Sequence, residues 1–240
     1  MPTTEKTYVL VHGAFHGGWC WRDVARGLRK RGHQVFTPTL TGLGERAHLR
    51  HIDPDLDTHI ADVVQTLFCE ELENVVLVGH SYAGAVISGV ADCMAQALRH
   101  LVFLDALVLP PDRHVLYAAS DQALAYYHAL SKEAGGSGFI PAPPAEFFGI
   151  EEPEHIVWVE QHLCPHPLAS FMSPLRLANP PGNGLPVTYI RCTSPRFTEI
   201  DNSHARALGM PGWNHRELAA GHDPMVSVPE ELTAMLAAMD

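Results

Sequence analysis

The sequence contains no run of apolar residues long enough to cross a bilayer. Its first residues, MPTTEKTYVLVHG, lack the pattern of a secretory signal and lead almost directly into an apolar run. We therefore expect a cytoplasmic protein that has no membrane as its partner. At 240 residues, the chain is long enough for one domain with a sizeable core, or for one domain with an insertion.

Basic residues are scarce in this sequence. The 16 lysines and arginines are outnumbered by 27 acidic residues, which gives a formal net charge of −11, and we expect no basic cluster to offset it. This balance argues against nucleic acid or an anionic membrane as partner. The five cysteines are scattered, odd in number and form no C-x-x-C, so we expect buried free thiols rather than a disulfide framework or a zinc knuckle.

Short apolar runs alternate with helical patterns along much of the chain. The runs predicted as buried parallel strands are Tyr8–His12, Gln34–Phe36, Asn74–Gly79, Leu101–Asp105 and Val187–Cys192. The predicted helices are Trp19–Lys30, Leu56–Glu71, Tyr82–Leu98 and about Pro229–Met239. Pro229 suits the first turn of the last helix. This alternation predicts an α/β protein with a mainly parallel sheet.

The alternation stops after Leu107. The segment 108–184 is rich in proline and contains two helical patches, Asp121–Lys132 and Glu154–Leu163. A structureless loop of this length is improbable in a compact domain, so we expect a small, partly helical cap over the carboxyl-terminal edge of the sheet. The predicted core then comprises residues 1–107 and 185–240.

Ser81 lies between a strand pattern, NVVLVG, and a helical pattern, YAGAVISGVAD, as the nucleophile of a tight strand-to-helix turn does. Such a turn needs small residues two positions before and two positions after the serine. Gly79 meets the first need, and Ala83 stands where glycine is usual, which is acceptable if the residue is helical. The alternative is a serine that only caps the helix.

The end of the first strand offers a partner for this serine. In His12-Gly13-Ala14-Phe15-His16, a backbone N–H can bind a developing oxyanion together with the N–H of the residue after the nucleophile. The predicted donors are Ala14 and Tyr82. The alternative is a turn whose glycines serve only backbone geometry; a dinucleotide-binding loop is disfavoured because GAFHGG is not G-x-G-x-x-G.

His222 is the predicted general base. It follows a late apolar segment and a glycine, comes after the serine in chain order, and has an ordinary pKa that suits a base at neutral pH. Most of the sixteen histidines are expected at the surface. His155, His162 and His166 invite a metal site, but no carboxylate or cysteine completes a ligand set, so we expect no metal.

Six segments together resemble one family. In chain order they are VLVHGAFHGGWCW, PTLTGLGER, VVLVGHSYAG, LVFLDA, TYIRCT and AAGHDPM, and they span nearly the whole chain outside the predicted cap. The chain resembles an α/β-hydrolase, and more narrowly the small esterases related to plant methylesterases, pyrethroid-type carboxylesterases and hydroxynitrile lyases. The resemblance implies the α/β-hydrolase fold, a hydrophobic ester, thioester or lactone as substrate, and no cofactor.

Two positions separate the esterases from the lyases of this group. The lyases tend to have threonine in the place of Gly13 and lysine directly after the catalytic histidine. Here Asp223 follows His222, and an aspartate would repel a departing cyanide that a lysine would help to neutralise. Ester chemistry is favoured.

The resemblance fails at the third member of the expected triad. Related enzymes commonly carry an aspartate in a Cys-Thr-x-Asp-Arg pattern, whereas this chain has Cys192-Thr193-Ser194-Pro195-Arg196. Asp105, at the end of LVFLD, is the favoured substitute, because some α/β-hydrolases carry the acid at this strand end. Glu199 or Asp201, or a Ser–His dyad without a carboxylate, are the alternatives.

The predicted function is that of a serine hydrolase, which cleaves a small hydrophobic or aromatic ester through an acyl-enzyme on Ser81 and His222. Phe15, Tyr126 and Trp158 are the candidate substrate contacts. The alternatives are a lyase or cyclase of an aromatic metabolite, or a ligand-binding protein with impaired turnover, which Pro195 favours. The expected partner is a small molecule, and a homodimer is left open.

Overall fold

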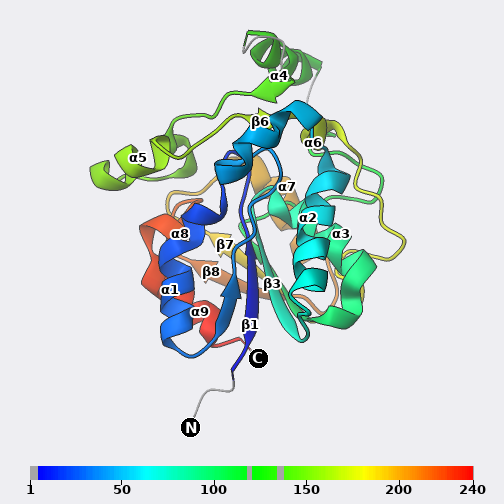
Figure 1. Ribbon diagram of the computed structural model, residues 1–240, viewed down its shortest axis with the longest axis vertical. Helices are drawn as coiled ribbons and strands as arrows, with labels where there is room; N and C mark the ends of the chain where they lie inside the picture. Colours follow the sequence, from blue (N-terminus) through cyan, green and yellow to red (C-terminus); the bar gives the residue numbers. More distant parts are fainter. Residues whose placement is uncertain (1–4, 118–120, 134–137, 240) are drawn as a thin grey trace.

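The computed structural model describes residues 5–117, 121–133 and 138–239 and has a six-stranded parallel sheet at its centre (Figure 1). The strand order is β2–β1–β3–β4–β7–β8. The strands are β1 (Thr7–Val11), β2 (Gln34–Phe36), β3 (Val75–His80), β4 (Leu98–Leu104), β7 (Val187–Cys192) and β8 (Asn214–Leu218). The all-parallel pairing confirms the predicted α/β class.

Burial along each strand follows its place in the sheet. All residues of β3 and β7 are buried, which explains why their sequences, VVLVGH and VTYIRC, are mainly apolar. The edge strand β8 exposes four of its five residues and reads NHREL, so it has no apolar run to reveal it in the sequence. Strand β4 begins at Leu98, three residues before the predicted start, and ends one residue before Asp105.

Helices cover both faces of the sheet. In Figure 1, α1 (Arg22–Lys30), α8 (Pro224–Ser227) and α9 (Pro229–Ala237) lie on one side, and α2 (Leu56–Cys69) and α3 (Ala83–Met94) lie on the other. Helix α7 (Asp201–Leu208) was not predicted, because its mostly polar sequence, DNSHARAL, shows no long apolar stripe. No helix in the described ranges combines the length and hydropathy needed to span a bilayer.

The segment between β4 and β7 contains short elements rather than further strands of the main sheet. They are α4 (Asp121–Glu133), β5 (Phe139–Ile140), α5 (Pro153–Glu160), β6 (His166–Pro167) and α6 (Leu168–Met172), with β5 and β6 paired antiparallel. In Figure 1, α4, α5 and β6 lie beyond the ends of the strands, above the sheet. The elements occur where a partly helical cap is predicted, and the exact boundaries of that cap stay a prediction.

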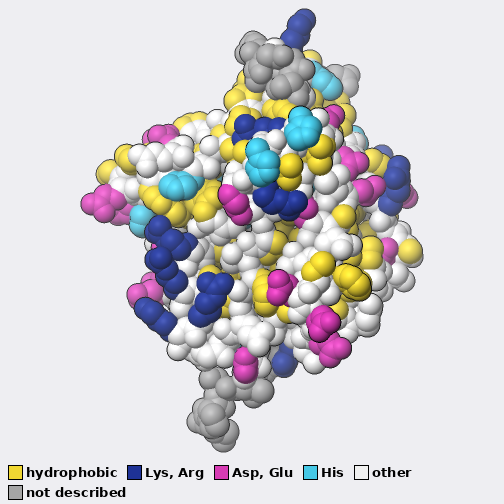
Figure 2. Space-filling model, viewed as in Figure 1, with side chains coloured by type: hydrophobic (Ala, Val, Ile, Leu, Met, Phe, Trp, Pro, Cys, Tyr) yellow, Lys and Arg dark blue, Asp and Glu magenta, His cyan; other side chains and the backbone are white. Residues whose placement is uncertain are grey.

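Several basic side chains gather over α1, on the left in Figure 2, in an otherwise acidic chain. Their charge is partly neutralised locally, because Arg22 and Arg26 both lie 3.2 Å from the Asp23 carboxylate. The guanidinium of Arg29 donates to the Val35 carbonyl at 2.6 Å. The expectation that no basic cluster exists was therefore wrong for α1, but most of this cluster already has internal partners.

Gly84 lets α3 approach the chain that follows β4. A Cβ at Gly84 would lie 2.1 Å from the Leu107 carbonyl oxygen, a backbone atom that cannot rotate away. The Leu107 N–H in turn donates to the Ser81 carbonyl at 2.9 Å. The glycine that stands one place later than the usual motif thus serves a different contact from the one required two residues after Ser81.

We expect Gly84→Ala to lower the free energy of unfolding by about 1–3 kcal/mol, because the added methyl forces α3 and the Leu107 backbone apart. Urea unfolding measures this change. Gly209→Ala is the matched control: φ is −84 and the nearest atom to an added Cβ is 3.4 Å away, so little change is expected. Equal stabilities of the two variants would contradict the packing argument.

Candidate active site

Ser81 lies in a tight turn between β3 and α3. Its φ is 52, in the left-handed region that few residues other than glycine adopt, so the turn is strained. A Cβ at Gly79 would lie 2.7 Å from the Ala83 carbonyl oxygen, which explains the requirement for glycine there. Ala83 is fully buried and is the first residue of α3, where its single methyl is accommodated. The turn therefore forms with alanine in the place of the usual glycine.

Ser81, His222 and Asp105 form one chain of hydrogen bonds. Ser81 Oγ lies 2.8 Å from His222 Nε2, and His222 Nδ1 lies 2.7 Å from Asp105 Oδ2. Because a carboxylate only accepts, Nδ1 carries the proton and Nε2 is free to accept the serine proton. The three residues come from the ends of β3, β8 and β4, so the sheet itself brings them to one edge.

Asp105 is fully buried and its second oxygen has partners of its own. Asp105 Oδ1 accepts the Cys192 N–H at 3.0 Å and a guanidinium N–H of Arg191 at 3.1 Å. Arg191 also contacts Asp201 at 2.6 Å. Of the carboxylates weighed from the sequence, Asp105 therefore contacts the histidine, whereas Asp201 contacts Arg191.

The segment after β7 has packing roles in place of the expected acid. Pro195 lies so close to Gly149 that a Cβ on this glycine would be 2.9 Å from the proline ring. Phe197 stacks on the His222 ring, with 3.9 Å between ring centroids and 21° between planes. Glu199 lines the cavity described below. This segment fixes the orientation of the imidazole by contact with its face.

The predicted oxyanion donors lie beside the serine. A Cβ at Gly13 would be 2.9 Å from the Ser81 Cβ, so the loop after β1 passes directly over the turn. Ala14, Ser81 and Tyr82 line the same cavity. Among the described residues, neither the Ala14 nor the Tyr82 N–H donates a hydrogen bond to another backbone group. Both are therefore available to a ligand.

A cavity of about 610 Å³ opens above Ser81. Its wall is largely apolar and includes Phe15 and Tyr126, two of the predicted substrate contacts, together with Tyr127, Phe147, Phe148, Phe171 and Phe197. The prediction that Trp158 is the third contact was wrong, because Trp158 is not among the described residues that line this cavity. Its ring packs at right angles on Trp19, with centroids 5.1 Å apart, and lies under the Arg22 guanidinium, so it supports the outside of the core.

Asp223 does not face this cavity, contrary to the expectation that its charge would act on a leaving group. It is 1% exposed, and its Oδ2 lies 3.0 Å from His16 Nε2. The His16 cation lowers the pKa of the Asp223 carboxyl against the opposing effect of burial. Asp223 is a buried partner of the loop that carries Ala14.

Histidines are concentrated in the interior, and the expectation that most lie at the surface was wrong. Eight are buried: His12, His16, His33, His59, His80, His100, His166 and His222. Burial lowers the pKa of His12 to about 3 and also lowers the pKa of His59, His80 and His166. Only their polarity is visible in the sequence, so nothing there could have revealed these positions as internal.

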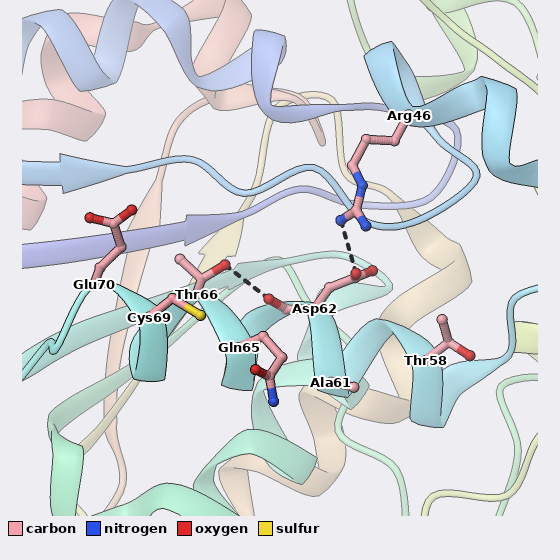
Figure 3. A pocket seen from close by; sticks show the side chains of 8 residues that line it. All are labelled: Arg46, Thr58, Ala61, Asp62, Gln65, Thr66, Cys69 and Glu70. Atoms are coloured by element: carbon pink, nitrogen blue, oxygen red, sulfur yellow. Dashed lines mark hydrogen bonds and ion pairs between the residues drawn. The ribbon is translucent and has the colours of Figure 1, made fainter.

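Within the described ranges no group of three or more histidine, cysteine or acidic side chains is arranged to hold a metal ion. His162 is exposed and accompanies Trp158, while His166 is buried against Ser170. A second hollow of about 490 Å³ lies along α2 (Figure 3). Its central carboxylate, Asp62, already accepts from Arg46 and from the Thr41 N–H, so this hollow offers no comparable chemistry.

Comparison with known proteins bears on this geometry. The model of the alpha/beta hydrolase family matches residues 8–235. The chain belongs to the alpha/beta hydrolase family. The chain is 41% identical over 249 residues to the carbendazim hydrolyzing esterase of Nocardioides sp. (strain SG-4G). The aligned region covers 97% of this chain and 98% of the relative.

Two further comparisons bear on the sequence and on the fold. An alpha-hydroxynitrile lyase of Arabidopsis thaliana is 35% identical over 109 residues, 45% of this chain and 42% of the lyase. A solved extracellular alpha/beta-hydrolase from a Paenibacillus species superposes with a TM-score of 0.83 at 22% identity, covering 96% of this chain and 97% of that one. The fold prediction is confirmed, and the chain is an esterase-like enzyme of this family.

The buried neutral histidines predict that acid destabilises this α/β-hydrolase. His12, His59, His80 and His166 have native pKa values below their ordinary value, so below about pH 6.5 the unfolded chain binds protons that the native chain does not. The free energy of unfolding should fall by up to about 1.4 kcal/mol per pH unit for each histidine. Urea unfolding at about pH 7.5, 6.5 and 5.5 measures the slope.

A control variant separates this effect from general acid sensitivity. His48→Gln removes an exposed imidazole and should leave the slope unchanged. His166→Gln should remove one proton from the difference in proton binding between the unfolded and native chains, which lowers the slope by up to about 1.4 kcal/mol per pH unit. A stability that is flat between these pH values would show that the interior histidines do not resist protonation.

Proposed function

We propose that this chain is a serine esterase that cleaves a small ester of an apolar or aromatic group through an acyl-enzyme. The observation that carries the proposal is the hydrogen-bonded chain from Ser81 Oγ through His222 to the buried Asp105 carboxylate, open to an apolar cavity. The arrangement is that of a nucleophile, its base and the group that orients the base.

The proposed reaction uses each of these groups in turn. His222 Nε2 takes the Ser81 proton as Oγ attacks the carbonyl carbon, and the Ala14 and Tyr82 N–H groups bind the oxyanion. Asp105 stabilises the imidazolium that forms. His222 then protonates the leaving alcohol as the carbon–oxygen bond breaks, and water attacks the acyl-serine by the same route, which releases the acid and restores Ser81.

The cavity and the relatives support an apolar or aromatic substrate. The wall above Ser81 is rich in aromatic rings. Among the described lining residues it includes Glu199 and His16, whose partner is the Asp223 carboxylate, but no lysine or arginine, which suits a neutral substrate. The 41% identical relative is named for hydrolysis of carbendazim, so carbendazim belongs in a first substrate panel beside p-nitrophenyl acetate and butyrate.

The lyase alternative is disfavoured by two contacts. A side chain at Gly13, where the lyases tend to have threonine, would collide with His80 and Ser81. Directly after His222, where the lyases tend to have lysine, this chain has Asp223, which points to His16. Pro195 no longer favours a protein without turnover, because Asp105 lies within hydrogen-bond reach of His222. Tight binding of an ester without its cleavage would revive that alternative.

Ser81 should react with a fluorophosphonate, because its hydroxyl is hydrogen-bonded to a base and lies in the cavity. Intact-mass spectrometry should show one adduct on the wild-type protein and none on Ser81→Ala. Ser173→Ala, which alters a half-buried serine that donates to the Ala169 carbonyl, should keep the adduct. A folded wild-type protein that never labels would overturn the proposal.

Asp105→Asn should lower kcat by about 10,000-fold, since the amide favours the wrong tautomer of His222. Asp201→Asn removes a carboxylate that reaches Asp105 only through Arg191, so its effect should stay within about 10-fold. Steady-state kinetics with p-nitrophenyl butyrate compares the two. A normal rate for Asp105→Asn together with a collapse for Asp201→Asn or Glu199→Gln would transfer the role to the other carboxylate.

A further inference from the structure

The loop after β1, residues 13–15, is held by histidine side chains. The Gly13 carbonyl oxygen lies 2.8 Å from His12 Nδ1, and the Ala14 carbonyl oxygen lies 2.7 Å from His16 Nδ1. The Ala14 N–H, which is the proposed oxyanion donor, lies between these two carbonyls in the chain. Its direction is therefore fixed by how firmly both carbonyls are held.

Phe15 continues the same pattern in a strained conformation. Its φ is 68, which an aromatic residue rarely adopts. The Phe15 N–H donates to His166 Nδ1 at 3.3 Å, and its carbonyl accepts the Cys164 N–H at 3.0 Å. Contacts from other parts of the chain therefore maintain a loop shape that its own backbone disfavours.

Two of these histidines are neutral by their hydrogen-bond partners. His12 Nε2 accepts the Leu40 N–H at 3.0 Å, which leaves the single ring proton on Nδ1 for the Gly13 carbonyl. His166 accepts from Phe15 on Nδ1 and donates from Nε2 to Ser170 Oγ at 2.9 Å. Each ring uses one donor and one acceptor, as a neutral imidazole must.

His16 is different, because both of its ring nitrogens face acceptors. Nδ1 lies 2.7 Å from the Ala14 carbonyl oxygen, and Nε2 lies 3.0 Å from Asp223 Oδ2. Neither a carbonyl nor a carboxylate has a proton to give, so both ring nitrogens must carry one. His16 is thus an imidazolium, and both members of the pair are 1% exposed.

The groups packed around this pair leave Asp223 as its counter-charge. His80, at the end of β3, lies 3.6 Å from Asp223 Oδ1 through its Nε2, and that nitrogen donates to the His222 carbonyl at 2.7 Å. Burial lowers the pKa of His80 and raises the pKa of the Cys20 thiol, so both are neutral. Among the described residues Asp223 Oδ1 has no hydrogen-bond partner, so His16 is the main partner of this buried anion.

We propose that His16, held as an imidazolium by Asp223, is a positioning residue for the oxyanion loop. It acts on the reaction through the Ala14 peptide and does not touch the substrate's reacting atoms. Because Asp223 directly follows His222, the same pair joins the loop of the oxyanion donor to the loop of the base. This inference rests on the proposed esterase reaction.

The pair has a defined pH range. Asp223 raises the pKa of His16 above its ordinary value, and His16 lowers the pKa of Asp223. The stabilisation by His16 is fully present below its ordinary pKa and is lost as the pH rises through its raised native value; the stabilisation by Asp223 is lost as the pH falls through its lowered one. In alkaline solution the remaining ring proton stays on Nε2, which faces the carboxylate, so a lone pair on Nδ1 would face the Ala14 carbonyl and the hold on Ala14 would be lost.

Nuclear magnetic resonance of the wild-type chain with 15N-labelled histidine tests the charge directly. The ring of His16, assigned as the signal absent from His16→Gln, should show protons on both nitrogens at neutral pH and lose one only on the alkaline side. A His16 ring that is neutral at about pH 7 would have a pKa no higher than the ordinary value for histidine. That result would overturn the proposal whether or not the enzyme hydrolyses any ester.

Kinetics of Asp223→Asn tests the positioning role. The asparagine amide can donate to a neutral His16, so the ring stays in place but loses its charge. We expect kcat to fall about 10-fold with little change in KM, because a charge-assisted hold on the Ala14 peptide becomes an ordinary one. The wild-type kcat should also decline in alkaline solution, and this decline should disappear in the variant.

Asp92→Asn is the matched control. Asp92 also accepts two backbone N–H groups, from Ala178 and Asn179, but it is half-buried and lies in the last turn of α3, at the end of the helix away from Ser81. It should keep the wild-type kcat and pH profile. If Asp223→Asn also keeps both, the positioning role is wrong. If Asp223→Asn does not fold, the resonance measurement on the wild-type chain decides, and a wild-type chain that never hydrolyses or labels refutes the esterase proposal instead.

Discussion

The buried carboxylate of Asp105 organises the edge of the sheet. One oxygen binds the imidazole of His222 and the other binds the Cys192 N–H and Arg191, so the segment after β4, the end of β7 and the segment after β8 meet at a single anion. A fully buried charge is tolerated only where such partners surround it. The position of His222 over Ser81, and with it the shape of the cavity, depends on this contact.

Sequence patterns predict the frame of this protein because its central strands are buried on both sides. Runs such as VVLV and TYIRC can be recognised without knowledge of their neighbours, and the turn at Ser81 can be recognised from the strand and helix around it. Strand β8 and helix α7 are different. Their residues are mostly polar, and they are structured because neighbouring elements pair or pack with them.

The choice among Asp105, Glu199 and Asp201 shows where a sequence stops being informative. All three follow strands that end at the same edge, and all three are ordinary carboxylates. The decision depends on which loop reaches across β7 to His222, and on Arg191, which binds Asp105 and Asp201 at once. The interior histidines present the same difficulty, since the protonation state of an imidazole follows from partners that lie far away in the chain.

The site surrounds Ser81 with imidazole rings that serve both as packing groups and as hydrogen-bond partners. Imidazole rings fill space as aromatic rings do, and each also satisfies backbone groups that a phenyl ring would leave unpaired. His80 joins the turn of Ser81 to the His222 carbonyl, and His16 joins Asp223 to the Ala14 carbonyl. The cost is that several of these rings, among them His12, His59, His80 and His166, resist protonation.

The location of Asp105 has a consequence for how this enzyme can diverge. In the pattern that the resemblance led us to expect, the segment after β7 would carry the acid of the triad. Here Phe197, Glu199 and Ile200 from that segment line the cavity, while the carboxylate that contacts the imidazole belongs to a different loop. Glu199 and Ile200 can therefore change with a new substrate while the Asp105–His222 contact stays as it is, whereas Phe197 is less free because it stacks on the His222 ring.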